Sequence, residues 1–337
     1  MGSLRSVTEE NENLIFSPFA FKSADTKGRM YPCEPDELRT EFQRDRDRII
    51  HSQSFRRLMN KTQVFLAPAG DHYRTRLTHT LEVCQIARTI ARALRLNEDL
   101  AEAVALGHDL GHTPFGHSGE SVMQECYSPD FTHYRQSLRV VDIIEKDGKG
   151  LNLTYEVRDG IVNHTVEAHP ASTLEGVIVF HADHIAYINH DIDDACRAGV
   201  LKIEDIPKDL REILGERHSQ RINTMVMSIV RASTGRNEIK MEPEIRAASD
   251  RLHKFMYENI YFNPIVKAEE KKSKDLLTRL FEYYVKHPDK LTGFYRKELE
   301  TEPVERCVCD FVSGMTDRYA IETYRSLFIP EVWRGIK

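Results

Sequence analysis

The chain has 337 residues, of which 40% are hydrophobic and 30% charged. This composition excludes a disordered protein and allows a full core in one large domain or two. Lys and Arg total 47 against 53 Asp and Glu, so the net charge of −6 argues against a surface that binds nucleic acid throughout. No stretch approaches the length of a membrane span, and no targeting segment is visible. We therefore expect a cytoplasmic protein without membrane contact.

Hydrophobic periodicity predicts helices along almost the whole chain. The expected elements are, in order, a charged helix over 36–59, a short extended segment or strand over 61–66, and helices from about 78, over 98–109, from 131, over 155–164 and over 173–196. From residue 204 to the end the pattern stays helical, with short breaks at five prolines and a terminal helix over about 304–328. About a dozen helices with almost no strand predict an all-α fold.

A basic run precedes the first candidate ligand. Residues 44 to 76 include eight basic residues and only three acidic ones. A solvated helix surface is the ordinary explanation of such a run, and a cradle for phosphate groups is the alternative.

Two histidines end inward-facing stripes on consecutive helices. His79 shares a helical face with Val83 and Ile90, and His108 ends a stripe that steps by four residues and is followed directly by Asp109. A single inward histidine is more often a core residue than a ligand. Two of them, one beside an aspartate, favour a metal site.

The stretch HDLGHTPFGHSGE, residues 108–120, carries most of the ionisable side chains. Its glycines and proline end the helix and let the backbone come close to a ligand. His117 and Glu120, three residues apart, are expected to face each other on a new helix. In such a pair the carboxylate orients the imidazole, which can then donate a proton to a leaving oxygen or position an attacking water.

The helix over 173–196 carries three carboxylates on one face, because Glu175, Val179, Asp183, Tyr187 and Asp191 recur every four residues. The apolar and aromatic members indicate a buried face, and buried carboxylates need a cation or hydrogen bonds. Asp183 is therefore a candidate for contact with a metal or a substrate.

Together, His79, His108, Asp109 and Asp183 offer two imidazoles and two carboxylates from three helices. Mixed nitrogen and oxygen donors suit manganese, iron, cobalt or zinc, and magnesium if waters complete the shell. Such a divalent ion would polarise a phosphoryl oxygen or lower the pKa of a bound water. The sequence does not choose among these metals.

The same four residues resemble the metal signature of the HD superfamily of phosphohydrolases. Neighbouring strings narrow the resemblance to its deoxyguanosine triphosphate triphosphohydrolase branch: FQRDRDRIIH (42–51), FRRL (55–58), KTQVF (61–65), RLTH (76–79), the 108–120 stretch and GMTDRYA (314–320). The resemblance covers nearly the whole chain. It implies an HD-type helical core with additional C-terminal helices, and hydrolysis of a deoxynucleoside triphosphate at the α-phosphorus to deoxynucleoside and tripolyphosphate.

Residue roles follow from the resemblance, position by position. It implies that the metal ligands are His79, His108, Asp109 and Asp183. It implies that the residues around the reacting phosphate are His112, His117, Glu120 and His133. It further implies that Gln63 and Arg76 contact sugar and phosphate, and that Tyr187 and Asp191 sense the deoxyribose, the tyrosine ring excluding a 2′-hydroxyl.

Two positions depart from the family strings. The last ligand stands in Asp183-His184-Ile-Ala-Tyr, where the family usually has a second aspartate, so a contact around the metal changes at His184. The string Phe131-Thr-His133-Tyr replaces the common Phe-Glu-His-Asn, with the histidine kept.

The expected layout is an N-terminal extension over 1–35, an HD phosphohydrolase core over 36–200 and a C-terminal helical region over 201–337 packed on the core. The resemblance implies a homo-oligomer, a hexamer or tetramer. Two alternatives stay open: an HD-type nucleotidase or phosphodiesterase that acts on another nucleotide, and a module that binds nucleotides or single-stranded nucleic acid.

Overall fold

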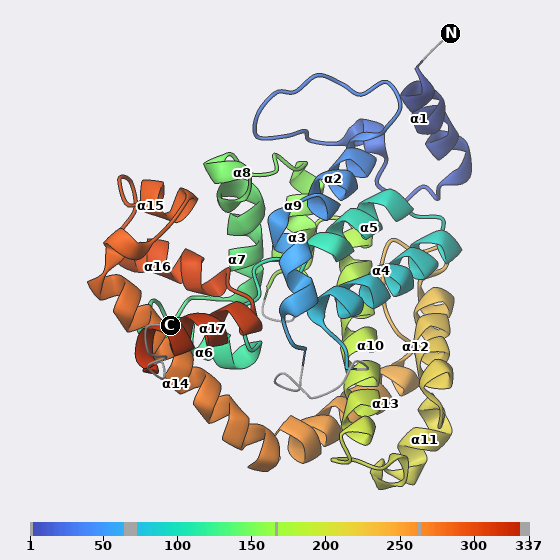
Figure 1. Cartoon of the computed structure of the whole chain (residues 1–337). Coiled ribbons are helices and arrows are strands. Elements are labelled where there is room, and N and C mark those ends of the chain that lie inside the picture. The colour runs from blue at the N-terminus through green and yellow to red at the C-terminus, as the bar shows by residue number, and fades with distance from the viewer. Residues whose placement is uncertain (1–2, 64–72, 166–167, 262–263, 331–337) are drawn as a thin grey trace, which may run out of the picture.

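The computed structural model describes residues 3–63, 73–165, 168–261 and 264–330, and within these ranges it is all-α, as predicted. Figure 1 shows α10 passing through the middle of the molecule, with α4 and α5 against it. The only β contacts in the described ranges are two isolated bridges, Arg29 with Thr154 and Thr62 with Thr75. None of the described helices is long and apolar enough to cross a membrane.

The α-helices of the N-terminal part are α1 (Leu4–Ile15), α2 (Glu41–Ile50), α3 (Gln53–Arg57), α4 (Arg76–Ala93), α5 (Glu98–Gly107), α6 (His117–Cys126), α7 (His133–Arg139), α8 (Glu145–Gly148), α9 (Tyr155–Val162) and α10 (Leu174–Arg197). Those of the C-terminal part are α11 (Lys208–Leu214), α12 (His218–Ser233), α13 (Pro243–Met256), α14 (Pro264–Lys286), α15 (Phe294–Glu298), α16 (Val304–Ser313) and α17 (Asp317–Phe328). Short 3₁₀ turns lie at Ser23–Asp25, Leu58–Asn60, Ile203–Asp205 and Pro288–Lys290, and π-helical turns at Val140–Ile144 and Tyr257–Tyr261.

Capping residues correct two predicted boundaries. The single helix expected over 36–59 begins only at Glu41, after a capping box formed by Thr40 and Gln43, and is interrupted where Ser52 caps α3. At the first start the Gln43 side chain accepts the Thr40 N–H, and at the second the Ser52 hydroxyl accepts the Phe55 N–H. Of the extended segment expected over 61–66, the described part contributes one bridge, and residues 64–66 lie outside the described ranges.

Prolines set the helix starts in the C-terminal part, as expected. Pro243 and Pro264 occupy the first positions of α13 and α14, where their missing N–H costs nothing. The single terminal helix expected over 304–328 is wrong, because residues 314–316 divide it into α16 and α17. Thr316 caps the second of these by accepting from the Tyr319 N–H.

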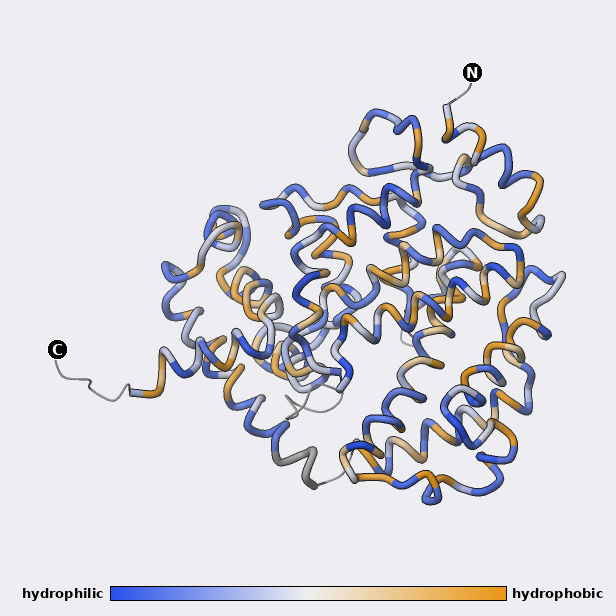
Figure 2. Tube along the Cα trace, turned by 45° about the vertical axis from the view of Figure 1, so that its right-hand side comes forward, coloured by the Kyte–Doolittle hydropathy of each residue, from blue (hydrophilic) through white to orange (hydrophobic). Residues whose placement is uncertain are grey.

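Two hydrophobic clusters form the interior. The larger is built around α4, α5 and α10 and extends through α11 to α13 as far as Ile260. The smaller joins α14, α16 and α17 to α6 and to Phe115 of the 108–120 stretch. Figure 2 shows hydrophilic and hydrophobic segments alternating along the helices, as expected when each helix buries one stripe. The 108–120 stretch therefore lies between the two clusters.

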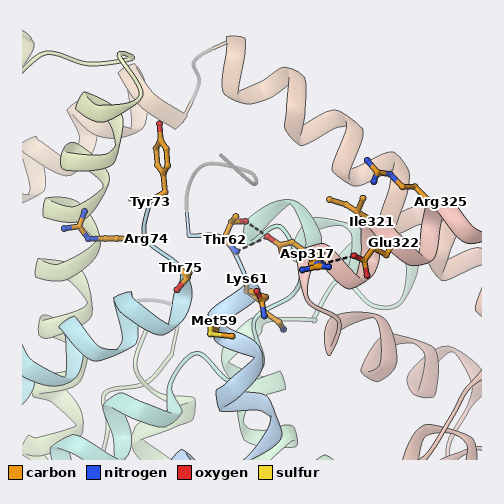
Figure 3. Close-up of a pocket in the computed structure, with 12 residues that line it drawn as sticks. Met59, Lys61, Thr62, Tyr73, Arg74, Thr75, Asp317, Ile321, Glu322 and Arg325 are labelled. Carbon is orange, nitrogen blue, oxygen red and sulfur yellow. Dashed lines mark hydrogen bonds and ion pairs between the residues drawn. The ribbon is translucent and has the colours of Figure 1, made fainter. Parts of the chain in front are cut away.

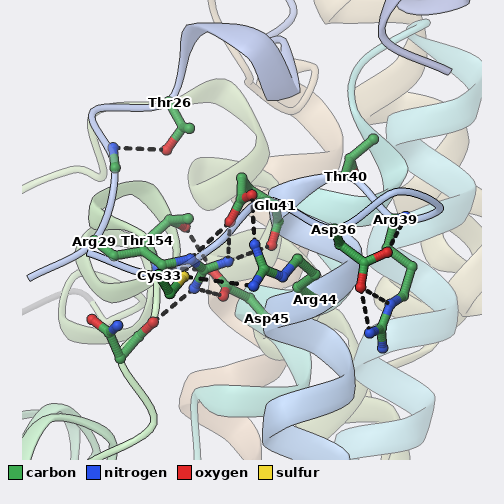
Figure 4. A network of polar contacts seen from close by, with 12 residues as sticks. Thr26, Arg29, Cys33, Asp36, Arg39, Thr40, Glu41, Arg44, Asp45 and Thr154 are labelled. Carbon is green, nitrogen blue, oxygen red and sulfur yellow. Dashed lines mark hydrogen bonds and ion pairs between the residues drawn. The ribbon is translucent and has the colours of Figure 1, made fainter. Parts of the chain in front are cut away.

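A buried ionic network fixes the N-terminal segment to this core. The Arg29 guanidinium lies between the carboxylates of Glu41 and Asp45 (Figure 4), and its side chain is 5% exposed. Asp45 is fully buried and also accepts from the backbone N–H and the hydroxyl of Thr154. The pair thus ties the loop before α2 to the segment that enters α9.

Candidate active site

The four predicted metal ligands converge between α4, α5 and α10. His79 Nε2 lies 3.0 Å from Asp183 Oδ1, and His108 Nε2 lies 3.6 Å from Asp109 Oδ1 and 3.9 Å from Asp183 Oδ1. Two atoms bound to one ion at about 2.1 Å lie about 3 Å apart at a right angle and at most about 4.2 Å apart. The observed distances fall in this range, and the donor atoms of His79, His108 and Asp109 lie within 4.8 Å of one another, so the cluster could hold a divalent cation.

The hydrogen bonding of His108 supports that fit. Its Nδ1 lies 2.6 Å from the carbonyl oxygen of Ala105, so Nδ1 carries the hydrogen and Nε2 keeps a lone pair. His108 Nε2 is buried and has no hydrogen-bond partner among the described residues. A buried acceptor nitrogen among carboxylates, with its other nitrogen fixed by a carbonyl, is the arrangement of a metal-ligating histidine.

The electrostatics of these residues favour ionised carboxylates. Burial would raise the pKa of Asp109, but the neighbouring His108 and Arg76 outweigh burial and hold this pKa well below its usual value. Burial would also raise the pKa of Asp183, but His79 and His108 outweigh burial, and this pKa falls to about 2. In return Asp183 raises the pKa of His79 against the effect of burial. The carboxylates are therefore charged at neutral pH and able to bind a cation.

A second group of side chains, predicted to handle protons, adjoins the predicted ligands. Glu120 accepts from the backbone N–H of His133 at 2.8 Å and lies 3.2 Å from His133 Nδ1. Glu120 raises the pKa of His133 against burial, and the pKa of Glu120 is itself lowered, because its hydrogen bonds to His117 and His133 outweigh burial. His133 stacks on His112 at 4.5 Å, whose pKa burial and Arg76 lower well below its usual value. The group thus places two imidazoles with opposite pKa shifts against each other, His133 raised and His112 lowered.

The turn that carries these residues depends on its glycines. A Cβ on Gly111 would lie 2.1 Å from the Ser137 backbone nitrogen of α7, so only glycine permits that close approach. Gly116 has φ +58°, and a Cβ there would lie 3.2 Å from an Arg76 guanidinium nitrogen. The turn therefore sits against both α7 and Arg76.

His117 is the exception within the proton-handling group. Its side chain is 87% exposed, and its Nδ1 lies 3.5 Å from Glu120 Oε2. Its ring is 5.8 Å from that of His112. The structure therefore places His117 at the rim of the site, where it could meet a substrate that arrives from solvent.

The predicted substrate-binding residues have different surroundings. Arg76 donates to Asp109 Oδ2 at 2.8 Å, next to the ligands, and the buried Oε1 of Gln63 has no hydrogen-bond partner among the described residues. Tyr187 follows Asp183 by one turn of α10 and forms a 2.9 Å hydrogen bond with Nδ1 of His184. The fourth residue of the set, on the next turn of the same face, is Asp191, which is 3% exposed.

Within the described ranges, the basic side chains of the 44–76 run form separate local contacts and not one phosphate cradle. Arg44 pairs with Glu41, and Arg48 donates to the carbonyl oxygens of residues 151 and 152. The ordinary explanation, a helix surface with local ion pairs, describes this part of the run. Of the eight basic residues, Arg76 contacts a predicted metal ligand.

Periodicity analysis missed His164, although the signal was present. Val157, Ile161 and His164 recur at offsets of four and seven and so continue one inward stripe from α9. The structure places the His164 ring 5.0 Å from that of His108 and 5.4 Å from that of His133. Burial and the neighbouring His108 lower the pKa of His164 to about 3, so its imidazole is neutral.

Two further residues, distant in sequence, bind backbone atoms of the 108–120 stretch. Lys61, fully buried, donates from Nζ to the carbonyl oxygens of His112 and Ser313, and burial lowers its pKa to about 7. Asp317 accepts from the backbone N–H groups of Thr62 and Phe115, each at 2.9 Å. Both line a pocket of about 480 Å³ beside residues 73–75 and α17 (Figure 3). Their partners are more than 50 residues away in the chain, beyond the reach of periodicity analysis.

Two family models match separate regions of the chain. The HD domain model matches residues 76–188, and the phosphohydrolase-associated domain model matches residues 239–326. The chain is also similar to the crystal structure of a phosphohydrolase from Bacteroides thetaiotaomicron, with a TM-score of 0.53 and 16% identity over 84% of this chain and 69% of that one. At that identity the likeness concerns the fold alone.

Three relatives named deoxyguanosinetriphosphate triphosphohydrolase-like proteins match over nearly their full length. That of Caldanaerobacter subterraneus subsp. tengcongensis is 55% identical over 330 residues, 98% of this chain and 97% of the relative. That of Desulfatibacillum aliphaticivorans is 50% identical over 97% and 99%, and that of Clostridium tetani 47% identical over 98% and 97%, respectively. The chain belongs to the family of deoxyguanosinetriphosphate triphosphohydrolase-like proteins, hydrolases built on an HD domain.

Proposed function

We propose that the protein hydrolyses deoxynucleoside triphosphates, dGTP among them, to deoxynucleoside and tripolyphosphate by attack of water at the α-phosphorus, with a divalent metal bound. The observation that carries the proposal is the contact between two groups of side chains. The donor atoms of His79, His108 and Asp109 lie within 4.8 Å of one another, and those of Asp109, His112 and His133 likewise. Asp109 thus links the metal ligands to the proton-handling residues.

His79, His108, Asp109 and Asp183 would hold the metal, which when bound supplies a Lewis acid for a phosphoryl oxygen and acidifies a water ligand. Arg76, fixed on Asp109, presents a guanidinium for the phosphate chain next to the metal ligands. Manganese, magnesium, cobalt, iron and zinc all suit the mixed donors of the site.

His133 would deliver a proton to the departing oxygen, because Glu120 beside it raises the pKa of His133 against the effect of burial. His112 is neutral and can accept a hydrogen bond from water or donate one to the phosphate. His117, exposed at the rim, would close on the bound substrate, and Glu120 lies within 3.5 Å to orient it. These residues divide the acid and base roles by their pKa values.

Tyr187 and Asp191 would meet the sugar, since they follow Asp183 at one-turn intervals along α10. A half-buried tyrosine ring at that place would exclude a 2′-hydroxyl by steric contact. Gln63 would contact the sugar too, because its buried Oε1 has no hydrogen-bond donor among the described residues. We further propose a cytoplasmic enzyme that assembles as a hexamer or tetramer.

The test is product analysis on the four deoxynucleoside triphosphates and GTP, each with magnesium, manganese and cobalt. We expect tripolyphosphate from the deoxynucleotides, none from GTP, and none with Asp109→Ala. Asp209→Ala is the matched control, because Asp209 pairs with Arg251 on the surface of α11. Pyrophosphate or orthophosphate as the first product would overturn the proposal. Salt-dependent binding of single-stranded DNA that survives in Asp109→Ala, without turnover in any metal, would favour the binding module instead.

A further inference from the structure

His164 is a buried histidine with one nitrogen fixed and the other directed at the candidate metal site. It follows α9 and is 1% exposed. Its Nδ1 lies 2.6 Å from the carbonyl oxygen of Ile161. Since a carbonyl oxygen only accepts, Nδ1 carries the hydrogen and Nε2 keeps a lone pair. His164 Nε2 has no hydrogen-bond partner among the described residues.

His108 has the same arrangement, with its Nδ1 on the carbonyl oxygen of Ala105 and its Nε2 without a partner. The two rings are 5.0 Å apart and nearly perpendicular, at 80°. The metal-ligating atoms of His108, His164 and Asp183 lie within 4.8 Å of one another. His164 therefore offers a lone pair to the place where two predicted ligands already meet.

We propose that His164 is a fifth donor to the same metal ion, beside the two histidines and two aspartates. The inference rests on the proposed metal centre and adds a residue to it. A single ion is required, because the lone pair of His108 Nε2 binds one cation, and His108 belongs both to the group with His79 and Asp109 and to the group with His164 and Asp183.

Two glycines place His164 at the site. A Cβ on Gly107 of α5 would lie 2.6 Å from Ile161 Cδ1, and a Cβ on Gly160 of α9 would lie 2.6 Å from Val104 Cγ2. Both glycines let α9 pack closely on α5, which brings His164, two residues after the end of α9, against His108, the residue after α5. A core histidine without a ligand would leave Nε2 desolvated and unpaired, which is unfavourable for a buried polar atom.

The fifth donor narrows the class of metal. Three imidazoles and two carboxylates suit manganese, iron, cobalt or zinc, whereas magnesium prefers oxygen ligands and retains its waters. We therefore expect Mn²⁺ and Co²⁺ to bind more tightly than Mg²⁺.

The test measures metal binding directly, without a substrate. Metal-free wild-type protein, His164→Asn and His181→Asn are titrated with Mn²⁺ by electron paramagnetic resonance, and bound metal per chain is counted by mass spectrometry. His181 is the matched control, because it is a buried histidine of α10 whose pKa burial lowers to about 4. We expect one ion per wild-type chain, a Kd raised about 10–100-fold in His164→Asn and a Kd within twofold of wild type in His181→Asn.

A Kd for His164→Asn within twofold of wild type would overturn the proposal, as would two ions per wild-type chain. X-ray absorption of the Co²⁺-loaded wild type covers the case in which the variant does not fold: three coordinated imidazoles support the proposal and two overturn it. Because these measurements need no nucleotide, they stand even if the hydrolysis proposed above is absent. A protein that hydrolyses as proposed with only two imidazoles on the metal would refute this inference alone.

Discussion

Asp317→Asn should loosen the turn that carries the proton-handling residues. Asp317 begins α17 and uses both carboxylate oxygens: Oδ2 accepts from the N–H and the hydroxyl of Thr62, at 2.9 and 2.5 Å, and Oδ1 accepts from the N–H of Phe115 at 2.9 Å. Phe115 has φ +59°, a value that residues other than glycine seldom adopt. The hydrogen bond from its N–H to Asp317 helps to hold this conformation. An asparagine has one acceptor oxygen, and its NH₂ would face one of these N–H groups.

The expected magnitude follows from that mismatch. One buried backbone N–H loses its partner, which costs about 1–3 kcal/mol of the free energy of unfolding. Displacement of the turn lowers kcat on the order of 10–100-fold, because a shift of about 1 Å in a reacting group has that effect, while KM changes less. Arg318→Ala is the matched control on the neighbouring residue, which is 79% exposed and pairs with Glu322. It should change stability by less than about 0.5 kcal/mol.

The assay combines urea denaturation, steady-state kinetics of tripolyphosphate release and hydrogen exchange of the Phe115 amide. We expect faster exchange at Phe115 and a lower kcat in Asp317→Asn, and wild-type values in Arg318→Ala. If Asp317→Asn retained wild-type exchange at Phe115 and wild-type kcat, the carboxylate would not position the turn. A stability loss with unchanged kcat would make Asp317 a purely structural residue.

Two further substitutions test buried charges away from the site. Arg29→Met leaves the Asp45 carboxylate buried without its cation and should cost about 3–5 kcal/mol in urea denaturation; adding Asp45→Asn should restore part of it, and a loss below about 1 kcal/mol would contradict the network. Burial raises the pKa of Glu175 to about 7, although its Oε1 accepts from the N–H groups of Phe21 and Asn97. The folded-state pKa thus exceeds the ordinary 4.5, so stability is full below pH 4.5 and falls by about 3 kcal/mol as pH rises through 7. Glu175→Gln keeps the accepting oxygen and should remove this fall between pH 5 and 8, and an equal pH dependence in both proteins would refute the cause.

Local patterns predicted the fold class and many helix positions because each helix carries its own evidence. Asn97 caps α5 through the N–H groups of Asp99 and Leu100, as its position before an acidic first turn indicates. The inward stripe that ends at His79 likewise appears as the buried face of α4. Where prediction failed, as at Ser52 and at 314–316, a cap or turn interrupts a pattern that stays apolar on both sides.

Because the predicted ligands lie on inward faces of neighbouring helices, we expected them to lie close together. The distances from His79 and His108 to Asp183 agree with this expectation. The support of the site could not be predicted in this way. Lys61 and Asp317 act through backbone atoms of residues far along the chain, and a side chain that binds a backbone carbonyl or N–H leaves no periodic signal in the partner's sequence. The GMTDRYA string marked the place of Asp317 by resemblance, and the structure shows its partners.

The site therefore depends on both matched regions of the chain. The phosphohydrolase-associated region contributes Asp317 to the turn and Ser249, whose hydroxyl lies 3.4 Å from His184 Nε2. His184 Nδ1 in turn meets the Tyr187 hydroxyl, so α13 supports the tyrosine proposed to face the sugar. Because burial lowers the pKa of His184 to about 4, the imidazole is neutral and its two nitrogens can take opposite roles, Nδ1 accepting from Tyr187 and Nε2 donating to Ser249. An ionised aspartate at 184 would offer no donor to that serine. The histidine thus connects the C-terminal helices to Tyr187, as Asp317 connects them to the 108–120 stretch.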